Sequence, residues 1–159
     1  MDGPLFVLTL LGALGCGLIG GVLFAFSSFV MAALRRLPSA EGIAAMQSIN
    51  VLAVTPVFIT ALVGTAAACV ALVVGVLVSP EGNSPALVIA GAVSYLAGVV
   101  GVTGARNVPM NDRLAAVGAA DAGAAALWAE YLTRWTAWNH VRTVASLAAA
   151  VALTVALTV

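Results

Sequence analysis

The chain carries all its basic residues, six arginines, in two windows, and long apolar runs surround both windows. The first window is residues 35–36 and the second is residues 106–142. A transmembrane helix needs about 20 mainly apolar residues, and the runs between and beside these windows are of that length. The arginines therefore separate membrane-spanning segments from the loops that connect them.

The composition indicates an integral membrane protein. Of the 159 residues, 63% are hydrophobic and 8% are charged, with a mean hydropathy of +1.16, whereas about a quarter of residues are charged in a soluble domain. The chain has no lysine, a formal net charge of zero and no basic run that could follow a phosphate backbone, which excludes nucleic acid as a partner. We expect residues 1–159 to form a single membrane domain whose first partner is the lipid bilayer.

The apolar runs predict an all-α fold, a four-helix transmembrane bundle. The expected spans are about 5–34, 51–78, 86–105 and 139–159, and the expected loops on the arginine side are about 35–50 and 106–138. Pro56 interrupts the second run, and the residues at 79–85, with two prolines and a glycine, break the helix after it.

The positions of the arginines predict the orientation of the bundle. With four spans, the two arginine-containing loops lie on one side, and the opposite side carries only Asp2 and Glu81 as charges. Cytoplasmic loops hold the excess of Lys and Arg in multi-pass proteins. We therefore expect cytoplasmic arginine loops and extracytoplasmic termini in a cell membrane.

Both arginine-side loops are predicted to contain helix. In the first, Ile43, Met46 and Ile49 recur at helical intervals, which is typical of a short interfacial helix over residues 38–50. The second is longer than a connection between helices requires. Its composition becomes helical near Asp121, which predicts a long helical extension before the fourth span.

The glycines and cysteines inside the apolar runs are predicted to serve helix packing. Gly17 and Gly21 form a small-xxx-small pair, the pattern through which membrane helices approach closely, and they are the candidate face for a homo-oligomer. Cys16 and Cys69 lie in apolar runs and are expected to act as small hydrophobes.

Metal sites commonly need three or four ligands, so no metal is expected. A heme with His140 as its axial ligand is the alternative to a cofactor-free protein.

Residues 128–146 carry the densest group of aromatic and polar side chains. At about 100° per residue, one helical face of about 100° holds most of them, whereas His140 lies on another face. The members of this stripe are Trp128, Tyr131, Trp135, Trp138, Asn139, Arg142 and Ser146. An interfacial aromatic belt accounts for Trp128, Tyr131 and the nearby Arg134. For Trp135, Trp138, Asn139 and Arg142 we favour a binding pocket, because an asparagine and an arginine share the stripe with the tryptophans.

A second polar cluster follows the third span at residues 107–113. Pro109 biases Val108 away from helix, and Asn111 or Asp112 is expected to cap a helix that begins near Leu114. Asn107 has no such capping role and is a candidate ligand contact. Asn50, from the first loop, approaches the same membrane face.

Four separated motifs resemble the anthrone oxygenase-like family of small four-span membrane proteins. They are GVLFAFSSFV at 21–30, AMQSIN at 45–50, NVPMN at 107–111 and WTAWNHVRT at 135–143. The resemblance covers nearly the whole length and is strongest to bacterial members. Fungal enzymes of the family oxidise an anthrone to an anthraquinone with molecular oxygen and no evident cofactor.

The resemblance implies a cytoplasm-facing pocket for a flat hydrophobic molecule, anthrone- or quinone-like, in a cofactor-independent oxygenase. Arg142 with Asn139 or Asn107 would stabilise the oxyanion, and Asp112 and His140 are the available proton acceptors. The candidate substrate contacts are Trp135, Trp138, Asn139, Asn50 and Asn111. The alternative is a non-catalytic membrane subunit that binds a lipid, a quinone or a partner protein.

Overall fold

The computed structural model describes residues 3–78 and 84–159, nearly all of them helical. The elements in chain order are α1 (Pro4–Ala25), η1 (Phe26–Val30), α2 (Met31–Leu34), α3 (Ser39–Leu52), α4 (Pro56–Val78), α5 (Pro85–Tyr95), η2 (Leu96–Gly101), η3 (Thr103–Asn107), α6 (Val108–Ala115) and α7 (Ala124–Ala156). The three η segments are π-helical turns within otherwise α-helical columns.

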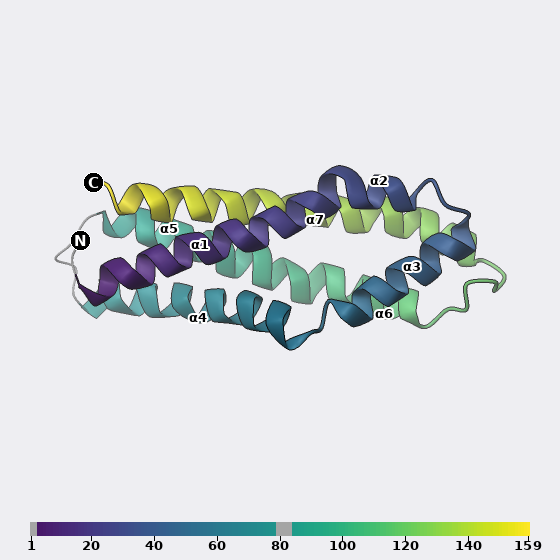
Figure 1. Cartoon of the computed structure of the whole chain (residues 1–159), viewed down its shortest axis with the longest axis horizontal. Helices are drawn as coiled ribbons and strands as arrows, with labels where there is room; N and C mark the ends of the chain where they lie inside the picture. The colour runs from purple at the N-terminus through teal and green to yellow at the C-terminus, as the bar shows by residue number, and fades with distance from the viewer. Residues whose placement is uncertain (1–2, 79–83) are drawn as a thin grey trace.

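These elements form an elongated four-column bundle (Figure 1). Helix α1 packs against α4 and α7, and α5 packs against the same two helices, so the columns alternate around a common core. The start of α1 and the end of α7 lie at one end of the bundle, and the connections after α2 and α6 lie at the other (Figure 1). We call the latter the arginine end, because Arg35 and Arg36 lie in the loop after α2 and Arg113 lies in α6.

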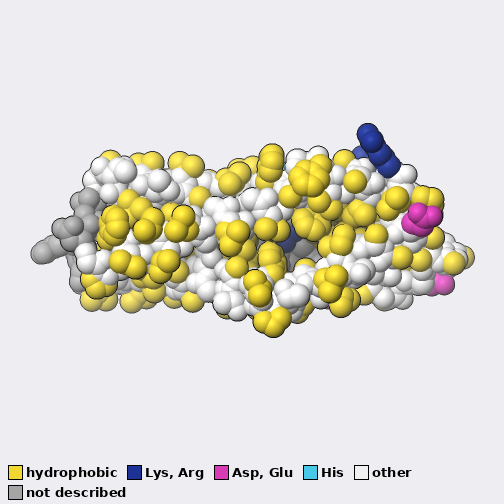
Figure 2. Space-filling model, viewed as in Figure 1, with side chains coloured by type: hydrophobic (Ala, Val, Ile, Leu, Met, Phe, Trp, Pro, Cys, Tyr) yellow, Lys and Arg dark blue, Asp and Glu magenta, His cyan; other side chains and the backbone are white. Residues whose placement is uncertain are grey.

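The expected all-α bundle of four spans is confirmed. Within the described ranges, four helical stretches are long and apolar enough to cross a membrane: Pro4–Leu34, Pro56–Val78, Pro85–Ala115 and Ala124–Ala156. Large apolar side chains such as Leu14, Leu18 and Val57 are more than half exposed, and hydrophobic side chains cover much of the face seen in Figure 2. This arrangement suits a protein whose outer surface faces lipid.

The second span begins later than the sequence indicated. Helix α3 continues to Leu52, and a new helix starts at Pro56, because proline lacks the N–H that an α-helix interior requires and restricts the residue before it. The expected short helix after the first span is present as α3, and its apolar face, with Ile43 and Met46, is buried against the arginine end of the bundle. There α3 takes the column position that α4 holds at the other end (Figure 1).

The third column is longer than the expected span of 86–105, because the helix continues to Ala115. Val108 is helical, and Asn111 and Asp112 lie inside α6, so the expectations of a break at Pro109 and of a cap before Leu114 were wrong. Pro109 occupies the first turn of α6, where its missing N–H is tolerated. The π-helical turn η3 comes directly before it.

Helix α7 takes up residues 124–138 of the loop that was expected at 106–138. It has 33 residues, which corresponds to about 50 Å at 1.5 Å per residue, whereas the hydrocarbon core of a bilayer is about 30 Å thick. The predicted helical extension before the fourth span is therefore confirmed, and it carries the arginine end beyond the apolar layer. Asp2, Glu81 and most of the predicted break at 79–85 lie outside the described residues.

Two apolar clusters fill the bundle interior. The one toward the chain termini is built around Ile19, Leu72 and Leu153 and includes the free, buried Cys16 and Cys69. The one at the arginine end is built around Met46, Leu114 and Trp128 with their neighbours. Polar side chains are buried between the two clusters.

Close contact between η2 and α7 requires a glycine. A Cβ on Gly98 would collide with the Cβ of Ala145, so we expect Gly98→Ala to lower the free energy of unfolding by about 1–3 kcal/mol, the usual cost of overpacking. The measurement is thermal unfolding in detergent. Gly64→Ala is the matched control, because a Cβ there meets nothing within 4 Å; equal stability of the two variants would contradict this packing.

Candidate functional site

A layer of buried and half-buried polar side chains crosses the bundle between the two apolar clusters. It draws on η1, η3 and α7, and we call it the polar layer. Its members are Ser27, Thr103, Asn107, Asn139, Arg142 and Thr143. Asn107, Asn139 and Arg142 are only 1%, 0% and 7% exposed, so each must find partners inside the protein or in a ligand.

Asn139 connects α7 to the first column and uses both ends of its amide. Its Nδ2 donates to the Leu23 carbonyl and to the Ser27 hydroxyl, each at 2.7 Å, and its Oδ1 accepts from Arg142 Nη2 at 2.6 Å. Thr143 extends this network through contacts with the Asn139 carbonyl and the Ser27 hydroxyl. Asn139 is therefore an orienting residue for Arg142.

Arg142 is a buried cation without a carboxylate partner in the part of the chain that the structure describes. Its Nη1 donates to Thr103 Oγ1 at 3.2 Å, and its guanidinium lies 5.2 Å from the Trp135 ring centroid. The ion pairs found among the described residues involve Glu130 instead. The buried Nε of Arg142 has no hydrogen-bond partner there. Burying a charge without a counter-ion is costly, so this position favours an incoming anion.

Asn107 and Asn50 present further unused polar atoms. Asn107 Nδ2 reaches the Trp135 carbonyl at 3.4 Å, while its buried Oδ1 has no partner among residues 3–78 and 84–159. The Asn50 side chain lies beside the Tyr131 hydroxyl, and its Nδ2 is likewise unpartnered in those residues. Arg142 Nε is a further buried donor without a partner in those residues.

The aromatic stripe is largely packed on itself. Tyr131 stacks on Trp128 and on Trp135, with ring centroids 5.6 and 5.9 Å apart. Asn111 Oδ1 accepts from both Tyr131 Oη and Trp135 Nε1 at 2.8 Å. The Trp135 ring thus has Tyr131, Phe26 and the Arg142 guanidinium as close neighbours.

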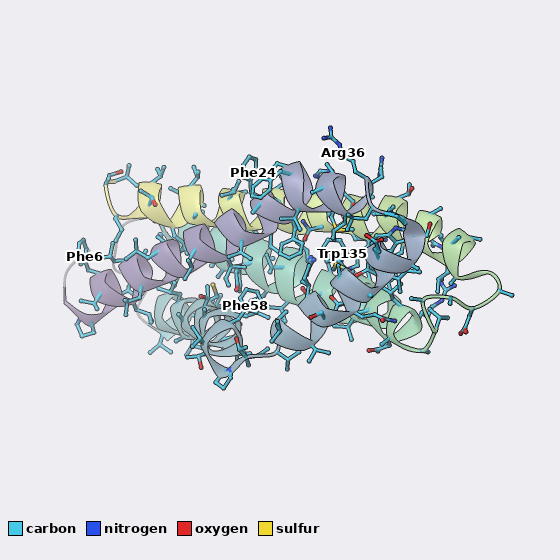
Figure 3. The ribbon with its side chains drawn as sticks, turned by 45° about the vertical axis from the view of Figure 1, so that its right-hand side comes forward. Phe6, Phe24, Arg36, Phe58 and Trp135 are labelled. Atoms are coloured by element: carbon cyan, nitrogen blue, oxygen red, sulfur yellow. The ribbon has the colours of Figure 1, made fainter. Side chains whose placement is uncertain are left out.

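The structure does not bring the two expected proton acceptors to this layer. Asp112 and His140 are both exposed, and His140 lies off the buried stripe, as the helical arithmetic indicated. Trp138 is half-buried beside Arg106, whose guanidinium is 4.9 Å from its ring centroid. Figure 3 shows Trp135 within the bundle and Arg36 projecting outward.

The π-helical turns are the feature that the sequence analysis missed. Ser27 lies in η1, and Thr103 and Asn107 lie in η3, so two of these turns supply half of the polar layer. π-helical turns occur frequently at functional sites because they reposition side chains within a helix. Ser27 and Thr103, as polar residues inside apolar spans, were the available signal.

Among the described residues, no group of three or more His, Cys, Asp or Glu side chains is placed to hold a metal ion. The polar layer contains none of these residue types. Its chemistry is that of a buried guanidinium with amide and hydroxyl groups, which can stabilise negative charge on a bound molecule.

The Asn139 network predicts a difference between neighbouring residues on α7. Asn139→Leu should lower the free energy of unfolding by about 1–3 kcal/mol, because the Leu23 carbonyl loses its side-chain donor and Arg142 loses its acceptor. His140→Ala, at an exposed position, should change it by less than about 0.5 kcal/mol. Thermal unfolding in detergent measures both; equal effects would contradict the network.

Comparison with known families gives one match. The profile of the family described as Anthrone oxygenase matches residues 54–152, more than half of the chain and including Asn107, Asn139 and Arg142. No curated protein and no solved structure matches the chain. With four apolar helices and this match, the chain is a multi-pass membrane protein that belongs to the anthrone oxygenase family.

Proposed function

We propose that the polar layer binds a flat hydrophobic molecule with an acidic oxygen, anthrone- or quinone-like, and that the protein oxidises it with molecular oxygen and no cofactor. The observation that carries this proposal is Arg142, a buried guanidinium without a carboxylate partner among the described residues and with an unused Nε. Membership of the anthrone oxygenase family supports the same chemistry.

The depth of Arg142 favours a substrate dissolved in the membrane. Arg142 precedes the end of α7 at Ala156 by 14 residues, about 21 Å along a helix, which is less than the hydrocarbon thickness of about 30 Å. Figure 2 shows a recess near the middle of one face with arginine atoms at its base.

The guanidinium would act on the acidity of the bound molecule. A nearby cation favours the ionised form of an acid, and an anthrone that loses a proton from its CH₂ group becomes a delocalised oxyanion. This anion transfers one electron to O₂, and the resulting radical and superoxide combine at carbon to give a peroxide anion. The peroxide anion takes up a proton from water and becomes a hydroperoxide. The hydroperoxide loses water, so anthrone and O₂ yield anthraquinone and water.

The polar layer supplies charge stabilisation and no carboxylate or imidazole base. Asp112 and His140 are exposed, so the proposed path for the proton is to water. Asn107 Oδ1 could accept from a ligand hydroxyl, and Asn50 Nδ2 could donate to a ligand oxygen. These atoms would orient the ring relative to Arg142.

Replacing the buried cation tests the proposal. Arg142→Gln should lower turnover of an added anthrone about 100-fold or more, as loss of an oxyanion donor does in other enzymes. It should also raise the pH at which the bound anthrone ionises, because the cation that favours the anion is gone. The measurements are anthraquinone formation and the absorbance of the bound anion across pH.

The matched control is Arg36→Gln, which removes an exposed arginine and should leave both readouts unchanged. An unfolding temperature close to that of the wild type would show that Arg142→Gln is folded. Full turnover in a folded Arg142→Gln protein would refute the proposal. A Soret band in the purified wild type would replace the cofactor-free mechanism with heme chemistry.

A second candidate is a non-catalytic subunit that binds a lipid, a quinone or a partner. It is favoured by Gly17 and Gly21, where an added Cβ would meet nothing within 4 Å, so this face of α1 is open to another helix, including one from a second copy. This reading predicts a copurifying ligand, identified by extraction and mass spectrometry, with no turnover by the wild-type protein.

The proposed orientation places the arginine end in the cytoplasm and both chain ends outside the cell membrane, following the excess of arginine in the two loops. Alkaline phosphatase fused after Val159 should then be active, and a fluorescent protein fused there should stay dark. The same reporters inserted in the loop at 116–123 should give the reverse pattern. A fluorescent fusion after Val159 would overturn this orientation.

A further inference from the structure

A basic groove lies on the outside of the bundle at the arginine end, separate from the polar layer. It has a volume of about 200 Å³ and lies between the η3–α6 segment and α7. Arg106 and Arg113 line it from the third column, and Arg134 and Trp138 line it from α7. A ligand in this groove would meet three guanidinium groups beside one aromatic ring.

These guanidinium groups are only partly neutralised. Glu130 lies 2.8 Å from Arg134 and 3.7 Å from Arg113, so one carboxylate serves two arginines. Arg106 lies over the Trp138 ring and pairs with no carboxylate in the described chain. The groove therefore carries a net positive charge of about two, and guanidinium donors match phosphate oxygens in geometry.

The groove lies at the depth of lipid headgroups. Arg106 follows the start of α5 at Pro85 by 21 residues, about 31 Å along the helix, and Trp138 precedes the end of α7 by 18 residues, about 27 Å. Both lengths match a hydrocarbon core of about 30 Å. A tryptophan beside arginines at this depth is typical of the membrane–water interface.

An apolar groove continues along the same two columns toward the chain termini. It has a volume of about 560 Å³ and lies between Leu87 of α5 and a row of α7 side chains that includes Val144, Val151 and Val155. Val141, which is 44% exposed, lies on α7 between the two grooves. A phospholipid has the matching order, with a charged headgroup followed by apolar acyl chains.

We infer that the basic groove binds the phosphodiester of an anionic membrane phospholipid, whose acyl chain lies along α7 toward Val144. A zwitterionic lipid fits less well, because the carboxylate that its ammonium group would need, Glu130, is already engaged by two arginines. This inference is independent of the proposed oxygenase function, since the residues it uses lie outside the polar layer.

The test is native mass spectrometry of the whole protein in detergent, with phosphatidylglycerol or phosphatidylcholine added at equal concentration. The wild type should retain phosphatidylglycerol preferentially. The double variant Arg106→Gln/Arg134→Gln should lose about fivefold in affinity for each arginine, or about 25-fold in total. Arg35→Gln/Arg36→Gln is the matched control, because it removes the same charge from the same end and should lose less than about threefold.

Three results of this experiment would overturn the inference that the groove binds an anionic phospholipid. Equal retention of the two lipids by the wild type, or equal losses in both double variants, would overturn it, since attraction would then be non-specific. Competition by inorganic phosphate as strong as that by phosphatidylglycerol would also overturn it and indicate a soluble anion. Unchanged unfolding temperatures and monodisperse elution establish that both double variants are folded.

Discussion

The hydrogen bond between Arg142 and Asn139 is the interaction on which the middle of this bundle depends. Through Asn139 it reaches Leu23 and Ser27 in the first column, and through Arg142 it reaches Thr103 in the third. Three columns are thus joined at one level of the bundle. An apolar cluster lies on each side of this level along the bundle.

The π-helical turns bring polar residues to the level of Asn139 and Arg142. A regular α-helix presents its polar residues at fixed angles, whereas a π turn shifts the register of everything beyond it. Ser27 in η1 and Thr103 in η3 contact α7 side chains from such turns. The hydrogen bonds of the polar layer offset the poorer backbone geometry, and they do so at the level where Arg142 is left with an unused donor.

Helix α7 separates two kinds of chemistry on two of its faces. Its inner face holds the packed aromatic rings and the polar layer, where one cation is buried. Its flank toward α6 holds Arg134 and Trp138 beside the exposed Arg106 and Arg113. We propose an apolar molecule with one acidic oxygen as the ligand of the interior, and a charged headgroup as the ligand of the flank. The family match supports the proposal for the interior only. The proposal for the basic groove, which is to bind a phospholipid, does not depend on it.

The sequence by itself determined the membrane class, the four spans and the buried stripe of α7, because apolar length and the 3.6-residue period are local properties. It also placed His140 off that stripe. Only the tertiary structure decided that Pro109 is helical after a π turn, that Asn111 binds two aromatic donors, and that α3 is a packed column. It alone showed that Arg142 has no carboxylate neighbour among the described residues, because that depends on which side chains three separate columns bring to one level.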